Sequence, residues 1–248
     1  MKFSNINIIV TQDYDHMSTQ AAEIIAQEII KKPSVVLGFA TGSTPLGIYK
    51  ELVRKYKDER LSFAGLTAFN LDEYHPITKE DPQSYYYFMQ EHLFGHVNVD
   101  PARVHIPDGA CADPAAECAA YDAKITAVGG IDLQLIGIGQ NGHIGFNEPG
   151  EIFSDGTNFT SLTDSTIQAN RRFFSAEEEV PRHAITMGTR TIMLARKLLL
   201  IANGEKKAGI IRQVLMGDIT PRVPASALRL HHNVTVILDK AAAAELLR

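Results

Sequence analysis

The sequence predicts an α/β fold built on a doubly wound, mostly parallel sheet with helices on both faces. Short β-branched runs alternate with longer amphipathic segments along the whole chain, which is the pattern that repeated βαβ units produce. The run from Ile131 to Ile138 is dominated by Ile and Leu, as in parallel strands that are covered on both faces. A chain of 248 residues, 45% of them hydrophobic, can bury one sizeable core. We therefore expect a single domain over residues 1–248.

Six segments have the composition of buried strands, because they are short and rich in apolar or β-branched residues. In chain order the expected strands are residues 6–10, 35–40, 67–71, 131–138, 197–202 and 234–238. Four longer segments repeat apolar residues at spacings of three and four, as helices that cover a sheet do. The expected helices are residues 18–30, 45–56, 115–128 and 205–216. Thr44 before Pro45 indicates a helix start, since a capping hydroxyl precedes the residue best tolerated in a first turn.

A further helix is expected to begin at Tyr85, where four aromatic residues run to Phe88. No basic residue lies between them. We therefore expect these rings to pack in the core and to form a cleft wall, and not to stack on nucleotide bases.

Residues 151–182, called the lid segment below, break the alternation of strands and helices. They are polar, rich in Thr, Ser and Asp, and show neither periodicity clearly. Long irregular segments inside compact domains are usually functional loops or disorder. We predict a lid over the carboxyl edge of the sheet, with an ordinary surface excursion as the alternative.

The composition argues against several classes of partner. The formal net charge is −5 and no run of Lys or Arg is present, so nucleic acid is not an expected partner. The two cysteines, Cys111 and Cys118, form no CxxC motif and indicate neither a disulfide framework nor a zinc site. The N-terminus lacks an export signal, and no apolar run approaches the ~18 residues of a membrane helix. We expect a cytoplasmic protein that does not bind a membrane.

Residues 137–150 combine flexible backbone with titratable side chains, in the order Gly-Ile-Gly-Gln-Asn-Gly-His-Ile-Gly-Phe-Asn-Glu-Pro-Gly. They follow an expected parallel strand, and open α/β sheets bind ligands at that end of their strands. His143 lies five residues before Glu148, close enough for the carboxylate to hold one ring nitrogen while the other transfers a proton. The alternative is a histidine bonded to loop backbone for structural reasons. Because no His-x-x-x-His spacing or carboxylate-rich cluster accompanies the pair, no metal ion is expected.

Residues 39–45, Phe-Ala-Thr-Gly-Ser-Thr-Pro, join an expected strand to an expected helix. N–H groups and hydroxyls converge at such a helix start, which suits a phosphate; a plain capped turn is the alternative. The P-loop Gly-Lys-Ser/Thr and the dinucleotide glycine spacing are both missing, so nucleotides are not expected ligands. Two basic pairs, Arg171-Arg172 and Lys206-Lys207, could reach this anion site, although a solvated basic surface explains each pair equally well.

The segment Asn-Leu-Asp-Glu-Tyr-His-Pro at residues 70–76 closes the expected strand 67–71. It places Asp72 or Glu73 at the same carboxyl edge as the other two loops. Neighbouring residues in extended conformation point opposite ways, so we expect one carboxylate to face the cleft and the other to face solvent or a partner. A solvated acidic turn is the alternative, because Asp and Glu are usually exposed.

Taken together, these segments resemble the glucosamine-6-phosphate deaminase family, whose members are also called glucosamine-6-phosphate isomerases. The resemblance extends over nearly the whole chain, with several motifs in the same order. They are Thr-Gly-Ser-Thr-Pro at 41–45, Phe-Asn-Leu-Asp-Glu-Tyr at 69–74, Ser-Tyr-Tyr at 84–86, Gly-x-Gly-x-Asn-Gly-His-Ile-Gly-Phe-Asn-Glu-Pro at 137–149 and Asn-x-Arg-Phe-Phe at 170–174.

The resemblance implies conversion of D-glucosamine 6-phosphate and water into D-fructose 6-phosphate and ammonium, without a metal or organic cofactor, in amino-sugar catabolism. By position, Asp72 matches the family's enolisation base, and His143 with Glu148 matches its ring-opening pair. The implied ligands of the sugar phosphate are Thr41, Gly42, Ser43, Thr44, Arg172 and Lys207.

Two departures from the family pattern bear on these expectations. Many members have Asp where this chain has Asn141, and an amide can only hydrogen-bond because it does not titrate at neutral pH. Larger members also have a longer C-terminal region and form hexamers activated by N-acetylglucosamine 6-phosphate. The sequence ends at Arg248 and gives no support to either property, so we expect a monomer or a small homo-oligomer.

Two alternative functions stay open on the sequence. A 6-phosphogluconolactonase shares the broad fold and a Gly-rich loop with a histidine, but Asn-Leu-Asp-Glu-Tyr with Asn147-Glu148-Pro149 resembles the deaminase pattern. A sugar-phosphate sensor is the second alternative, and it predicts a DNA-binding extension before Met1.

Overall fold

A computed structural model describes residues 5–174 and 179–246. Its main sheet has seven strands, all parallel, in the order β1-β10-β9-β6-β2-β3-β5. The strands are β1 (Ile6–Thr11), β2 (Val36–Phe39), β3 (Thr67–Asn70), β5 (Val104–His105), β6 (Leu133–Ile136), β9 (Leu198–Ala202) and β10 (Val234–Asp239). The predicted fold class is confirmed.

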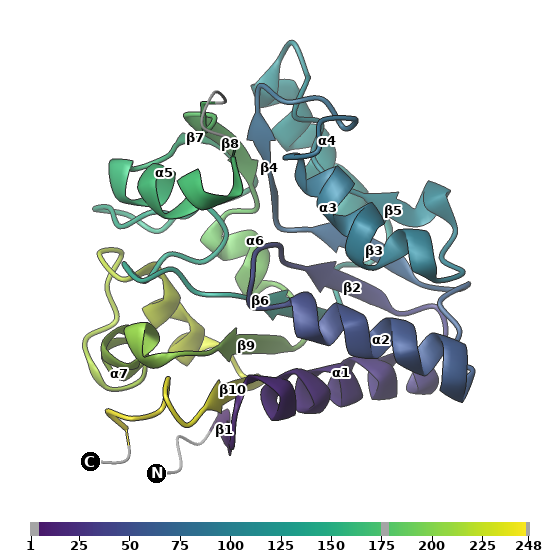
Figure 1. The fold of residues 1–248 in the computed structure, drawn as a ribbon. Helices are drawn as coiled ribbons and strands as arrows, with labels where there is room; N and C mark the ends of the chain where they lie inside the picture. The colour runs from purple at the N-terminus through teal and green to yellow at the C-terminus, as the bar shows by residue number, and fades with distance from the viewer. Residues whose placement is uncertain (1–4, 175–178, 247–248) are drawn as a thin grey trace.

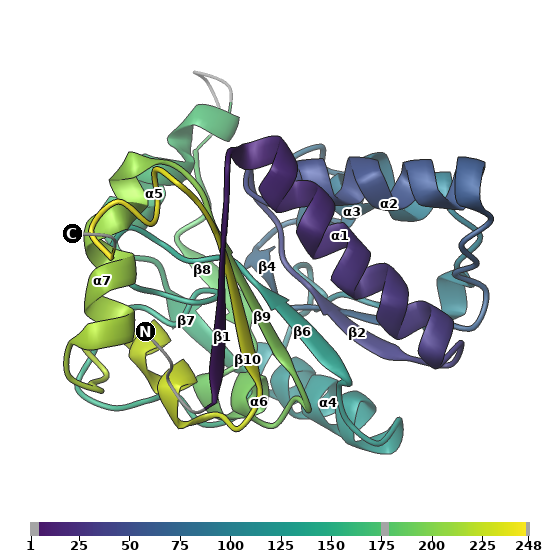
Figure 2. The ribbon, with the colours of Figure 1, turned by 90° about the horizontal axis from the view of Figure 1, so that it is seen from below.

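Helices cover both faces of this sheet. Figure 2 shows α1 (Tyr14–Lys31) and α2 (Leu46–Glu59) on one side of the strands, and α6 (Thr189–Met193) and α7 (Ala208–Met216) on the other. The remaining helices are α3 (Tyr85–His92), α4 (Pro114–Ala127) and α5 (Asp164–Asn170). Short 3₁₀ turns occupy Phe94–His96, Pro101–Arg103, Arg171–Phe173, Glu205–Lys207 and Pro224–Leu230. Within the described ranges, none of the helices is long and apolar enough to cross a lipid bilayer.

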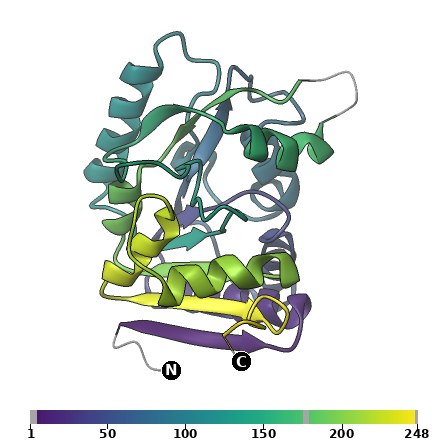
Figure 3. The ribbon, with the colours of Figure 1, turned by 90° about the vertical axis from the view of Figure 1, so that its left-hand side faces the viewer.

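A second, smaller sheet lies beyond the carboxyl edge of the first. It is antiparallel, in the order β4-β8-β7, and consists of β4 (Asp72–His75), β7 (Asn158–Ser161) and β8 (His183–Thr186). Figures 1 and 3 show this sheet and α5 in the upper part of the molecule, with β1 and β10 of the main sheet at the bottom. Only Leu71 separates β3 from β4, so the chain passes directly from the main sheet into the second one. A separate apolar cluster around Tyr74, Phe146 and Leu162 supports the small sheet.

The order of the strands reverses between β2 and β6. From β2 the chain continues to β3 on one side, whereas from β6 it continues to β9 and β10 on the other. In doubly wound sheets such a switch point opens a crevice at the carboxyl ends of the strands, where ligands bind. The loops after β2, β3 and β6 therefore meet at one place.

The six predicted strands and four predicted helices all form, with shifted ends. Helix α1 begins four residues before Ser18, because the Asp13 side chain accepts a hydrogen bond from the N–H of His16 and caps it. The prediction that Thr44 caps α2 is wrong: the N-cap is Pro45, with no side-chain cap. Thr44 Oγ1 instead donates to Asn203 Oδ1 at 2.9 Å, so this hydroxyl ties the loop after β2 to the end of β9.

The sequence missed the second sheet. Strand β4 reads Asp-Glu-Tyr-His, and a strand with charged residues on it does not show the apolar pattern of a buried strand. The lid segment, expected to be irregular, contains β7, α5 and a 3₁₀ turn; its residues 175–178 lie outside the described residues. That this segment moves as a lid stays a prediction.

The close packing of β2 against β6 gives a test of the core. A methyl group on Gly38 would collide with the buried side chain of Gln134 on β6. Gly38→Ala should lower the free energy of unfolding by about 1–3 kcal/mol, the usual cost of overpacking, measured by urea denaturation. At Gly150 a methyl group would meet only ordinary van der Waals neighbours. Gly150→Ala should therefore stay within about 0.5 kcal/mol of the parent, and an equal loss in both variants would contradict the packing argument.

Candidate active site

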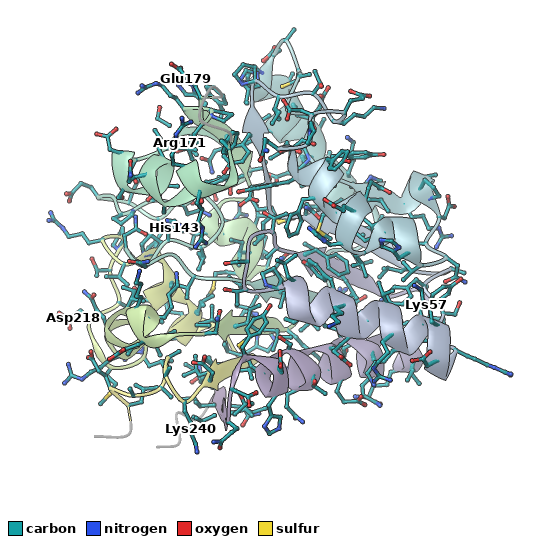
Figure 4. The ribbon with its side chains drawn as sticks, in the orientation of Figure 1. Lys57, His143, Arg171, Glu179, Asp218 and Lys240 are labelled. Carbon is teal, nitrogen blue, oxygen red and sulfur yellow. The ribbon has the colours of Figure 1, made fainter. Side chains whose placement is uncertain are left out.

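A cleft of about 1050 Å³ lies at the switch point. Its walls come from the loops after β2, β3 and β6, from the start of α3 and from the lid segment. In Figure 4, His143 lies between the α5 region and the end of β9. The cleft brings together nine of the ten residues that the sequence singled out, and Glu148 lies directly behind His143.

The loop after β6 holds an imidazole against a carboxylate. His143 Nδ1 lies 3.4 Å from Glu148 Oε2, and the same oxygen accepts a 2.7 Å hydrogen bond from Asn141 Nδ2. Asn141 Oδ1 also accepts from the N–H of His143 at 3.2 Å. A side chain at position 139 would collide with the imidazole, so Gly139 is required for the ring to lie over this loop. The geometry directs Nδ1 to the carboxylate and leaves Nε2 for proton transfer.

The environment of Glu148 favours its ionised form. Burial alone would raise its pKa, but hydrogen bonds and charge from His143, with hydrogen bonds from Thr166 and Asn141, hold the pKa below its usual value. A carboxylate in this state can orient an imidazole and stabilise the imidazolium that forms when the ring takes up a proton.

Asp72, the first residue of β4, is a second carboxylate in the same cleft. Its side chain lines the cleft although the residue is only 5% exposed. Burial, with the neighbouring charge of Glu73, raises the pKa of Asp72 to about 8. The loop of His143 passes close to it, since a Cβ on Gly145 would lie 3.3 Å from Asp72 Oδ2. A carboxyl group with a pKa near neutrality is suited to act as a general base.

Glu73 points away from the cleft, as alternation along a strand requires. It does not face solvent, because it is 2% exposed. Its two oxygens accept 2.9 Å hydrogen bonds from the N–H groups of Tyr85 and Tyr86, at the start of α3. Glu73 therefore anchors this helix against β4, and the helix in turn presents Tyr85 as a cleft wall, with its ring beside Tyr74.

The opposite end of the cleft is cationic. Arg172 donates to Ser43 Oγ at 3.2 Å, and Lys207 Nζ donates to the carbonyl of Ile138. Burial, together with the charge of Arg172, lowers the pKa of Lys207 to about 8. Two neighbouring cations beside hydroxyls and a helix start form a site that an anion would stabilise. Thr41, Gly42, Ser43 and Thr44 line the same end.

The other members of the basic pairs differ in position. Lys206 lines the cleft, whereas Arg171 is not among the lining residues. Within residues 5–174 and 179–246, no group of three or more His, Cys, Asp or Glu side chains is placed to hold a metal ion.

Several polar residues of the cleft were not singled out from the sequence. Thr166 donates to Glu148 Oε1, Asn170 Nδ2 donates to the hydroxyl of Tyr74 at 2.9 Å, and Asn203 accepts from Thr44. Thr166 and Asn170 lie on α5, in a stretch without clear periodicity. Asn170 belongs to the Asn-x-Arg-Phe-Phe motif and could have been found there; nothing local marks Thr166.

Fold and cleft together define a doubly wound α/β protein with a histidine–carboxylate pair, a separate buried carboxylate and a cationic end in one cleft. A model of the family described as glucosamine-6-phosphate isomerases and 6-phosphogluconolactonases matches residues 12–237. The chain belongs to this family.

Within the family, several deaminases are similar to the chain over nearly its whole length. It is 50% identical over 241 residues to a glucosamine-6-phosphate deaminase of Clostridioides difficile (strain 630), covering 97% of both chains. A solved structure of a monomeric glucosamine-6-phosphate deaminase superposes with a TM-score of 0.94 at 44% identity, covering 96% of this chain and 99% of that one. A 6-phosphogluconolactonase from Trypanosoma cruzi matches with a TM-score of 0.76 at 22% identity, covering 100% and 99%, and this likeness shows the shared fold alone. The resemblance found in the sequence is confirmed.

The lowered pKa of Lys207 predicts how anion binding depends on pH. Below about pH 8 this side chain is a cation, and above it the charge is lost. Sulfate keeps the same charge over this range. It should bind roughly 10-fold more weakly at pH 9.5 than at pH 6.5, which corresponds to the free energy that one hydrogen bond to a charged group contributes. Isothermal titration calorimetry measures the change.

Two variants control this measurement. Lys207→Met should bind sulfate weakly at both pH values, whereas Lys240→Met, at an exposed site far from His143 in Figure 4, should behave as the parent. Persistence of the full pH dependence in Lys207→Met would exclude Lys207 as its source.

Proposed function

We propose that this chain converts D-glucosamine 6-phosphate and water into D-fructose 6-phosphate and ammonium, as a deaminase that needs no metal or organic cofactor. The observation that carries the proposal is the position of Asp72. It gives the cleft a second, buried carboxylate beside the His143–Glu148 pair, and an aldose–ketose isomerisation needs a base for a carbon acid in addition to an acid–base group for ring opening. The deaminases at about 50% identity over nearly the whole chain support it.

His143 is proposed to open the sugar ring. Its free Nε2 takes the proton of the anomeric hydroxyl and returns it to the ring oxygen as the bond from C1 to that oxygen breaks. Glu148 holds Nδ1 and stabilises the transient imidazolium. Asn141 contributes by fixing Glu148 and the backbone of His143, since its amide takes up no proton.

Asp72 is proposed to move the proton between neighbouring carbons. It takes the C2 proton of the open-chain aldehyde to give an enolamine and returns a proton at C1, which leaves an iminium at C2. Water adds to this carbon, and ammonia leaves when its nitrogen is protonated. The ammonium group of the bound substrate favours ionisation of the Asp72 carboxyl, which offsets the effect of burial and makes the base available at neutral pH.

The cationic end of the cleft is proposed to hold the 6-phosphate. Ser43 and Thr44 with the amides of Thr41 and Gly42, together with Arg172 and Lys207, supply hydroxyls, N–H groups and two charges. Because the phosphate does not react, its binding energy can be used to orient C1 and C2 between His143 and Asp72.

We also propose that the protein acts in the cytoplasm as a monomer or a small homo-oligomer. The two cysteines are free thiols, one of them half-exposed, which suits a reducing compartment. The solved glucosamine-6-phosphate deaminase that superposes with a TM-score of 0.94 is described as monomeric. Size-exclusion chromatography with light scattering tests the assembly, and a hexamer would contradict it.

Substitution of Asp72 tests the proposed reaction. Purified parent protein should release ammonia from glucosamine 6-phosphate, measured with a coupled glutamate dehydrogenase assay. Asp72→Asn should lower kcat by about 10²–10⁴-fold, the usual contribution of a general base, while KM changes little because Asp72 is not one of the proposed phosphate ligands.

The same assay separates the alternatives. Proton release from 6-phosphogluconolactone without ammonia from the amino sugar would favour a lactonase, and binding of either sugar phosphate without turnover would favour a sensor. Near-parental ammonia release by Asp72→Asn would exclude Asp72 as the base.

A further inference from the structure

We infer that Thr166, on the lid helix α5, is a positioning residue that sets the His143–Glu148 pair for ring opening. This inference rests on the proposed function and adds to it. It assigns to the lid segment a chemical role, which is to complete the hydrogen bonds of Glu148 when α5 lies over the cleft.

Thr166 completes the hydrogen bonds of the Glu148 carboxylate. Oε2 of Glu148 accepts a 2.7 Å hydrogen bond from the Asn141 amide and lies 3.4 Å from His143 Nδ1. Its other oxygen, Oε1, accepts a hydrogen bond from the hydroxyl of Thr166. Thr166 is 3% exposed, and its Oγ1 lies 3.5 Å from His143 Nδ1 as well. The hydroxyl therefore touches both members of the pair, from a segment 18 residues away along the chain.

The direction of this hydrogen bond follows from the two oxygen atoms that flank the Thr166 hydroxyl. Thr163 caps the helix, accepting from the N–H of Thr166 at 3.3 Å. Its hydroxyl also donates to Thr166 Oγ1 at 3.2 Å. An ionised carboxylate can only accept a hydrogen bond, so Thr166 gives its single hydrogen to Glu148 and accepts from Thr163.

The electrostatic effect follows from this direction. The hydrogen bond from Thr166 is one of the interactions that lower the pKa of Glu148 against the opposing effect of burial. An ionised Glu148 holds the proton of His143 on Nδ1 and leaves Nε2 as the acceptor for the anomeric proton. Because Asn141 carries no charge, the ionised form of Glu148 is favoured by the hydrogen bond and charge of His143, with the hydrogen bonds from Thr166 and Asn141 adding to them.

Other contacts of the same segment connect Thr166 to substrate binding. Asn170 near the end of α5 donates to Tyr74, and Arg172 just beyond it donates to Ser43 at the anion end. Three polar contacts thus fix α5 and the turn that follows it to the loop after β6, to β4 and to the loop after β2. A phosphate that draws Arg172 inward bears on the position of Thr166, so phosphate capture and ring opening are coupled through α5.

The test compares Thr166→Val, which removes the hydroxyl but keeps the shape, with Thr166→Ser, which keeps the hydroxyl. Ammonia release is measured across pH with glucosamine 6-phosphate carrying hydrogen or deuterium at C2. Thr166→Val should lower kcat/KM roughly 10- to 100-fold, the worth of a hydrogen bond to a charged group, and Thr166→Ser should restore most of it. The matched control is Thr160→Val on β7, whose hydroxyl donates to the neighbouring Ser161 carbonyl and to no other group among the described residues; it should resemble the parent.

Two readouts distinguish positioning from a structural role. In Thr166→Val the acid limb of kcat/KM should move to higher pH, because Glu148 loses a donor that stabilises its ionised form. The deuterium isotope effect on kcat/KM should fall toward one, because ring opening, and not removal of the C2 proton by Asp72, becomes the slow step. In a Glu148→Gln background, Thr166→Val should have little further effect.

Three outcomes would overturn the inference. They are an unchanged pH profile and isotope effect in Thr166→Val, a loss that Thr166→Ser does not restore, and an undiminished effect of Thr166→Val in Glu148→Gln. If the parent protein is active, any of these outcomes excludes the proposed role of Thr166 and leaves the proposed function standing. A parent protein that releases no ammonia from glucosamine 6-phosphate would remove the proposed function itself.

Discussion

The parallel alignment of β2, β3 and β6 side by side is the constraint on which the site depends. Their carboxyl ends point the same way and the connections diverge from them in opposite directions, so no chain crosses the crevice that they leave. Three loops from residues near 40, 71 and 137 can then converge without a helix between them. His143 and Glu148 follow β6, Asp72 follows β3 and the hydroxyls of the cationic end follow β2, so their relative placement is a property of the sheet. Arg172 from the lid segment and Lys207 from beyond β9 are added to this frame.

The second sheet makes that placement rigid where the chain leaves β3. Asp72 and Glu73 both sit on β4, which is paired with β8 along its length, and Glu73 is bonded to the start of α3. One carboxylate of the adjacent pair thus holds the backbone while the other faces the cleft. Because neighbouring residues of a strand point to opposite faces, Glu73 can hold α3 on one face while Asp72 lines the cleft on the other.

The sequence was most informative where local pattern and tertiary structure agree. The six expected strands follow from composition and the four covering helices from periodicity, and the Gly-rich loop follows from its composition and its place after a strand. Strand β4 could not be found this way, because its charged residues are buried only through contacts made elsewhere in the chain. Thr44 was misassigned as a cap because its partner, Asn203, is 159 residues distant. Thr166 had no local signal, since its significance arises from Glu148.

The two carboxylates of the cleft are placed in opposite environments, and this contrast explains why one site can hold two different acid–base tasks. Glu148 is surrounded by donors, which lower its pKa, whereas Asp72 is buried beside another carboxyl, which raises its pKa to about 8. A group that must only orient an imidazole benefits from a fixed negative charge. A group that must take a proton from carbon and return it benefits from a pKa near the working pH. The two carboxylates therefore differ in pKa because different parts of the chain surround them. The surroundings of Glu148 include Thr166 of the lid segment, and those of Asp72 include Glu73 on β4.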